Sequence, residues 1–191
     1  MARNKEFDEN EVLRKAMELF WRQGYEKTSM QDLVEYMGIH RRSLYDTFGD
    51  KHTLFIKVLD HYNEIIGNRI ENEVIQLNSV KDAIRQLFKM IIVRDNQQLI
   101  GCLTVNTAVE LSLHDEQAAE KVVESFSKTE LMLNNLVLRG QKAGEISKYH
   151  DAKKISEFLH NSLVGLRVMT KTTDDTEKLN NIIDITLSVL D

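Results

Sequence analysis

The sequence predicts an all-α protein, and three observations support this expectation. The 191 residues include no proline, so the commonest helix breaker is missing. Apolar residues recur at spacings of three and four through most of the chain, which is the period of an amphipathic helix. The eight glycines are dispersed, and several follow directly on such a stretch. We expect a three-helix N-terminal domain, residues 1–50, and a C-terminal helical bundle, residues 51–191.

The first helix is expected from about Asp8 to Gln23. Asp8 serves as the N-cap, with Glu11 at the third helical position. Gly24, followed by Tyr25, ends the pattern. The stripe expected to face the core consists of Leu13, Ala16, Met17 and Phe20.

Residues 28–51 are the most informative part of the chain and read T-S-M-Q-D-L-V-E-Y-M-G-I-H-R-R-S-L-Y-D-T-F-G-D-K. We expect a helix that begins after Thr28, with Gln31 completing a capping box. Gly38 supplies the left-handed backbone that turns the chain. The next helix carries Ile39 and Leu44 inward. Two short helices joined in this way form a helix-turn-helix, whose second helix enters the major groove of DNA.

The side chains left outward on the second helix suit base edges and phosphates. Two solvated arginines are the competing interpretation of Arg41 and Arg42. An acid at Asp46 is unfavourable beside phosphate, so we expect it to pair with Arg42 four residues earlier, although it could accept from a cytosine amino group. The candidate DNA-binding residues are Thr28, Ser29, His40, Arg41, Arg42, Ser43, Tyr45, Thr47 and Lys51.

The series A-x-x-L-F-x-x-x-G-Y-x-x-T-S, D-L-V-x-x-M-G-I and S-L-Y-x-x-F-x-D-K resembles the tetracycline-repressor (TetR-like) family of bacterial regulators. The match covers about the first 55 residues, and the later fragment 141–146 also looks like the family. The resemblance implies that Tyr45 and Lys51 contact phosphate; alternatively, Tyr45 packs on its own domain and Lys51 only starts the next helix. It also implies a two-fold dimer formed through the last two helices, and a small effector that enters the C-terminal domain and releases a DNA operator.

Charge limits how such a protein could bind DNA. The net charge is −5, and residues 1–50 hold eight Lys or Arg against ten Asp or Glu. Positive charge is instead local, on Arg3, Lys5, Arg41, Arg42 and Lys51. We therefore expect few phosphate contacts per subunit, a moderate salt dependence and a need for dimerisation.

The remaining composition favours a cytoplasmic protein with no cofactor. There is a single cysteine, Cys102, which fits a reducing compartment and is more often an inert core residue than a redox sensor. The N-terminus lacks a signal-peptide layout, and no apolar run is long enough to span a membrane. The six histidines are scattered without a metal-binding spacing.

Six further helices are expected, at about 51–77, 80–93, 99–113, 116–142, 152–170 and 175–190. The third is apolar nearly all round, which predicts a helix surrounded by others. Asn106, Glu110 and His114 recur along it every four residues. Either they line an effector pocket, or Glu110 pairs with Arg94, Arg139 or Arg167 in a purely structural network. His114 alternatively lies at the exposed end of the helix. The predicted pocket residues are Phe88, Ile92, Leu103, Asn106, Glu110, Phe126 and Leu133.

The last two helices each carry an apolar seam. Ser162 and Gly165 are small enough to admit a second helix closely. The seams serve the dimer or pack inside one chain. Their residues are Leu159, Ser162, Leu163, Leu166 and Met169 on the first helix, and Leu179, Ile182, Ile183, Thr186, Val189 and Leu190 on the second.

Together these features predict a ligand-responsive transcriptional repressor that binds a near-palindromic operator as a dimer. An activator of the same architecture is one alternative. A helical small-molecule carrier or enzyme with a vestigial helix-turn-helix is the other.

Overall fold

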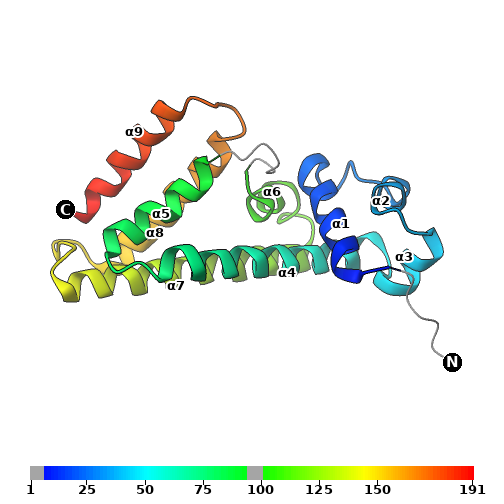
Figure 1. Cartoon of the computed structure of the whole chain (residues 1–191), viewed down its shortest axis with the longest axis horizontal. Helices are drawn as coiled ribbons and strands as arrows, with labels where there is room; N and C mark the ends of the chain where they lie inside the picture. The colour runs from blue at the N-terminus through cyan, green and yellow to red at the C-terminus, as the bar shows by residue number, and fades with distance from the viewer. Residues whose placement is uncertain (1–6, 94–100) are drawn as a thin grey trace.

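The computed structural model describes residues 7–93 and 101–191, and in these ranges helices, joined by short turns and loops, are the regular secondary structure. Figure 1 shows α1, α2 and α3 gathered at one end, α4 and α7 running lengthwise, and α5, α8 and α9 towards the other end. The elements are α1 Glu9–Gln23, α2 Met30–Met37, α3 Arg41–Phe48, α4 Lys51–Ile70, α5 Val80–Ile92, α6 Leu103–Glu110, α7 Glu116–Ala143, α8 Ala152–Met169 and α9 Thr176–Leu187, with a π-helix Glu71–Ile75 and a 3-10 turn Ser188–Leu190.

The caps of the N-terminal helices follow the expected chemistry, with one shift in register. Asp8 caps α1 as predicted. The capping box of α2 consists of Ser29 and Asp32, however, so the predicted pair of Thr28 and Gln31 is wrong. The Thr28 side chain is fully buried, and its hydroxyl donates to the carbonyl of Gly24 over 2.6 Å. Thr28 therefore closes the turn between α1 and α2, and the cap falls to the next residue.

The turn between α2 and α3 agrees with the expectation from sequence. Gly38 has φ 72° and ψ 31°, the left-handed conformation that a side chain disfavours. Leu33 and Met37 from α2, and Leu44 and Phe48 from α3, are buried. The helix-turn-helix is thus held from inside by apolar contacts, which fixes the direction of α3.

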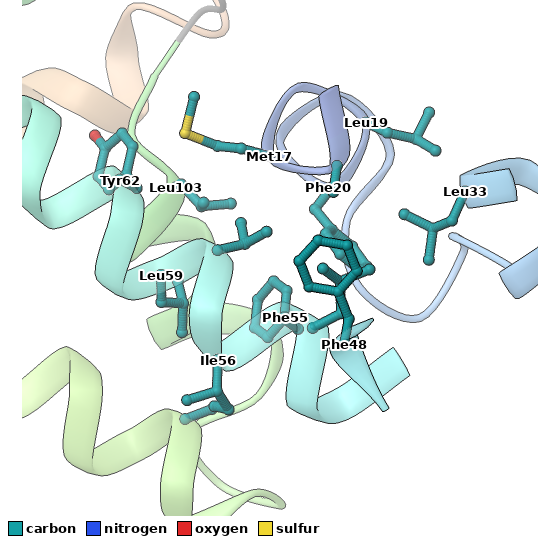
Figure 2. Close-up of a cluster of buried hydrophobic side chains, with 14 of the residues drawn as sticks. Met17, Leu19, Phe20, Leu33, Phe48, Phe55, Ile56, Leu59, Tyr62 and Leu103 are labelled. Carbon is teal, nitrogen blue, oxygen red and sulfur yellow. The ribbon is translucent and has the colours of Figure 1, made fainter. Parts of the chain in front are cut away.

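α4 carries the core of the N-terminal helices into the rest of the molecule. The Phe20 ring lies 5.0 Å from that of Phe55, and the Tyr25 ring lies 4.8 Å from it. Figure 2 shows Phe20 and Phe48 beside Phe55, with Leu59, Tyr62 and Leu103 continuing the cluster along α4 towards α6. This continuous core packs α4 and α6 directly against the N-terminal helices. The predicted domain boundary after residue 50 stays a prediction.

A second apolar cluster joins α5, α7, α8 and α9. Glu145, in the turn after α7, caps α5 from a distance. Its carboxylate accepts the hydroxyl of Ser79 over 2.5 Å and the backbone N–H groups of Val80 and Lys81 over 2.8 Å each. These hydrogen bonds lower the pKa of Glu145, and the one from Ser79 has the largest effect.

The predicted seams of the last two helices are mostly packed inside one chain. Leu159, Leu163, Leu166, Leu179 and Ile183 are all buried, because α5 and α7 cover them. Ser162, Met169, Ile182 and Val189 are half-buried, whereas Thr186 and Leu190 are buried. The apolar surface left open lies on another face, with Phe158, Val168 and Ile185 exposed.

Two predicted helices differ from the structure. The helix expected to reach about Leu77 continues past Ile70 only as a π-helix. Within the segment expected at 99–113, α6 spans Leu103–Glu110, and residues 99 and 100 lie outside the described ranges. Val109 is 81% exposed, so α6 is not surrounded on all sides. His114 lies beyond the end of α6 and is exposed, so it does not stack with Asn106 and Glu110.

Candidate nucleic-acid interface and its link to the helical bundle

α3 has one face anchored in the core and one open to solvent. Leu44 is 0% and Phe48 1% exposed, which fixes the helix from below. Arg41, Arg42 and Tyr45 are exposed on the other side, and Ser43 and Thr47 are half-buried at its edges. An exposed helical face with these donors matches what a recognition helix needs for base edges and phosphates.

The two arginines make only long contacts within the chain. The Arg42 Nε lies 3.6 Å from the Asp46 carboxylate, which confirms the predicted pair four residues apart. The Arg41 guanidinium lies 5.8 Å from the centre of the Tyr45 ring. Both arginines are free to turn to a phosphate or guanine edge, because exposed pairs of this kind contribute little. The side chain of His40 makes no capping hydrogen bond to α3.

Lys51 is fixed by the turn between α1 and α2. Its Nζ donates to the carbonyls of Tyr25 and Thr28 over 3.1 and 3.2 Å, and lies 4.1 Å from the centre of the Tyr25 ring. Ser29 is exposed at the cap of α2, whereas Thr28 is buried. Contacts of Thr28, Ser29 and Lys51 with DNA stay predictions, and burial disfavours the one assigned to Thr28. Arg3 and Lys5 lie outside the described residues.

Glu110, the last residue of α6, accepts hydrogen bonds from the turn between α1 and α2. Its two carboxylate oxygens accept the backbone N–H groups of Tyr25, over 3.1 Å, and Glu26, over 2.9 Å. Gly24 makes room for this contact, since a Cβ there would lie 2.9 Å from a Glu110 oxygen. The helix-turn-helix is thus joined to the bundle through a specific polar contact as well as through the shared core.

The sequence did not reveal this partner of Glu110. Arg139 donates to the carbonyl of Leu77, and Arg167 lies beside Tyr62 and Cys102, so the predicted pairing of Glu110 with Arg139 or Arg167 is wrong. Arg94 lies outside the described residues. Backbone N–H groups were the partners, and a backbone partner 85 residues away leaves no mark in side-chain spacing.

Asn106 also has a partner within the chain, because its Oδ1 accepts from the Lys171 ammonium over 2.6 Å. The predicted pocket walls divide between the two cores: Leu103 and Phe126 belong to the first cluster, and Phe88, Ile92 and Leu133 to the second. The pocket assignment stays a prediction.

The described residues also form an open groove of about 770 Å³ between α4, the π-helix and α7. None of the seven predicted pocket residues lines it. Its walls include Ile66, Ile70, Ile75, Met132 and Leu136.

An exposed, cationic recognition helix tied through α4 and α6 to a helical bundle defines a DNA-binding protein with a second, regulatory domain. Residues 12–58 match the family described as bacterial regulatory proteins, tetR family, and residues 81–186 match the tetracyclin repressor-like C-terminal domain. The chain belongs to the tetR family. It is therefore a ligand-responsive, DNA-binding transcription regulator.

Relatives match along the full chain. The uncharacterized HTH-type transcriptional regulator YezE of Bacillus subtilis (strain 168) is 36% identical over 194 residues, covering 100% of both chains. The repressor ComR of Escherichia coli (strain K12) is 32% identical over 97% of this chain and 90% of its own. A cysteine mutant of the tetR-family regulator CifR, complexed with 26-bp double-stranded operator DNA, has a TM-score of 0.89 and 25% identity and covers 100% of each chain.

Among the described residues, no helix has the length and apolar character needed to cross a membrane. The same ranges bring together no group of three His, Cys, Asp or Glu residues suited to a metal ion.

Proposed function

We propose that the protein is a transcriptional repressor that binds a near-palindromic operator as a dimer and leaves it when an effector binds. The observation that carries the proposal is the open face of α3, where Arg41, Arg42 and Tyr45 stand above buried Leu44 and Phe48. Repression is supported by ComR and the E. coli protein BdcR, both named transcriptional repressors. Regulators of this family are generally non-enzymatic, and we assign the chain no catalysis and a place in the cytoplasm, where its operator lies.

The dimer that the proposal requires would form on α8 and α9. Phe158 is 46%, Val168 45% and Ile185 77% exposed, and Gly165 is also open to solvent. Open apolar side chains beside a glycine allow two helices to approach closely, and regulators of this family dimerise. Two-fold symmetry then presents two copies of α3 to successive major grooves, about 34–36 Å apart.

Release by an effector requires that the effector prefer the arrangement that does not fit DNA, because equal affinity for both arrangements shifts nothing. α4 and α6 are connections through which such a preference can act. α4 carries the shared core, and α6 carries the Glu110 contact to the turn before α2. A movement of either one changes the position of α3.

DNA from the region upstream of the protein's own gene tests the proposal in a mobility-shift assay at moderate salt. Specific retardation is expected for the full chain, together with loss for a variant in which Arg41 and Arg42 are both alanine. Lys142→Ala is the matched control, since it removes a positive charge at the exposed end of α7, far from α3 (Figure 1). Retention of binding by the double variant would refute the role of α3.

The two alternatives give different results. Retardation that accompanies increased transcription of the downstream gene would identify an activator. Absence of specific retardation together with substrate turnover would identify the carrier or enzyme.

A further inference from the structure

The inner face of α8 carries polar groups into the middle of the bundle. His160, Val164 and Arg167 stand at positions i, i+4 and i+7 and therefore share one side of the helix. Val164 packs on the cluster that includes Tyr62 and Cys102. The three side chains thus point to the region enclosed by α4, α6 and α7.

His160 has one unused ring nitrogen in this region. The residue is only 6% exposed, and its ring meets the Phe126 ring edge-on, with the two centres 4.9 Å apart. Its Nδ1 lies 2.8 Å from the Glu130 carboxylate. The tautomer that fits this contact has its proton on Nδ1, so neutral His160 presents Nε2 as an acceptor. Nε2 is buried and has no hydrogen-bond partner among the described residues.

Arg167, about two turns further along α8, has no negatively charged partner among the described residues. In residues 7–93 and 101–191 its guanidinium has no ion pair and donates no hydrogen bond. Its neighbours are the hydroxyl of Tyr62 and the thiol of Cys102, which bond to each other over 3.1 Å. Burial raises the pKa of Tyr62 well above its usual value, so the phenol is neutral at physiological pH. Neither neighbour is a carboxylate, the anionic partner with which a buried guanidinium normally pairs.

We propose that this region binds the effector and that the effector is a small organic carboxylate with a hydroxyl or N–H group at its other end. The carboxylate pairs with Arg167, which presents the planar fork that suits it. The distal group donates to His160 Nε2. The Cα atoms of residues seven apart on a helix are about 10.5 Å apart, and Arg167 leans towards His160, so the ligand is shorter than that. The inference rests on the proposed function and names its ligand class.

The position of this site connects it to the DNA-binding domain. Cys102 is the residue from which α6 begins, and Glu110, at the other end of this helix, holds the turn between α1 and α2. A helix of eight residues is about 12 Å long. A carboxylate that draws Arg167 away from Tyr62 and Cys102 therefore acts at one end of α6, and the response appears at the other.

The open groove between α4 and α7 is less suited to an anion. Its walls carry the acids Asp60, Glu64, Glu71 and Glu124 against only Lys128 and Arg139. An anion placed there would face net negative charge. The groove also supplies the matched control, because Arg139 is an arginine of the same domain that lines it.

The test uses the full-length protein with 4-hydroxybenzoate, 4-hydroxycinnamate and 8-hydroxyoctanoate, each compared with its carboxamide by titration calorimetry. We expect at least one acid to bind at least tenfold more tightly than its amide. We expect Arg167→Met to weaken the binding of that acid at least tenfold. Arg139→Met should leave its affinity unchanged. Equal binding of acid and amide, unchanged binding by Arg167→Met, or no binding by any of the three acids would overturn the proposal.

His160 is tested with the acid that binds and its analogue lacking the hydroxyl. His160→Phe should weaken the binding of the hydroxy acid severalfold and leave the binding of the analogue unchanged, because only the hydroxy acid donates a hydrogen bond to Nε2. An equal effect on both compounds would remove the distal contact from the proposal.

The unfolding temperature of Arg167→Met without ligand shows whether the substitution disturbs the fold. Because Arg167 has no partner in the described structure, Arg167→Met should unfold at the same temperature as the wild type or higher. A fall of more than about 5 °C, a large change for a chain of this size, would mean that Arg167 is structurally paired, and would overturn the proposal. Failure of the wild-type protein to bind its operator would instead refute the proposed function, whereas operator release by a neutral compound alone would refute only this inference.

Discussion

The contact between Glu110 and the turn before α2 leads to a prediction of defined size. Glu110→Ala removes a carboxylate that accepts two backbone N–H groups, from Tyr25 and Glu26. Hydrogen bonds to charged groups contribute about 1.5–3 kcal/mol each when buried. Glu110 is half-buried and water can replace part of the contact, so we expect a total loss of about 2 kcal/mol.

In a domain of 150–250 residues, a loss of about 2 kcal/mol lowers the unfolding temperature by about 4–8 °C. Thermal unfolding followed by circular dichroism measures it. Glu120→Ala, which removes an exposed acid from α7, is the control and should change the temperature by less than about 1 °C. An unchanged unfolding temperature for Glu110→Ala would show that water satisfies the turn equally well, and the link between the domains would then lack its polar part.

A double-mutant cycle with Gly24 tests the geometry of the same contact. Gly24→Ala is costly on its own, because φ is +83° and the new Cβ would lie 2.9 Å from a Glu110 oxygen. Without the Glu110 side chain the steric part of that cost disappears, while the backbone part remains. The two substitutions should therefore destabilise less together than the sum of the singles. Strict additivity would contradict the close approach.

Three further predictions concern DNA, acid stability and assembly. Arg42→Ala should weaken operator binding by about 1–3 kcal/mol in fluorescence anisotropy, while gel filtration shows an unchanged dimer. Glu145→Gln should destabilise the protein at neutral pH. Because the pKa of Glu145 is lowered on folding, its contribution is present above its ordinary value of 4.5 and vanishes as pH falls through the lowered one, so unfolding curves of variant and wild type should converge in acid. Ile185→Asp, on the open face of α9, should give a folded monomer in sedimentation velocity, whereas Asp184→Asn should remain a dimer.

Local chemistry made much of the helical order predictable. Asp8, Gly24 and Gly38 mark helix ends through contacts within a few residues, and each was read correctly. The sequence alone places the cap of α2 one residue too early, at Thr28, because Thr28 and Ser29 have the same capping chemistry. Only the tertiary structure buries one of them and frees the other.

The regulatory half was less predictable, because its polar contacts join distant segments. The partners of Glu110 and Asn106 lie 85 and 65 residues away in the sequence. The apolar pattern of the last helices showed that both are amphipathic. The pattern does not indicate which of these apolar residues pack inside the chain and which stay exposed. The exposed ones, such as Phe158 and Ile185, lie outside the predicted seams.

The claim that α3 reads DNA as part of a symmetric pair is tested most directly by one binding measurement. Fluorescence anisotropy compares a duplex from upstream of the protein's own gene with a scrambled duplex of equal length and composition, and sedimentation gives the stoichiometry. The account predicts binding to the natural duplex at least about 10³-fold tighter than to the scrambled one, by a dimer. Equal affinity for the two duplexes, or a monomer that binds neither, would contradict it.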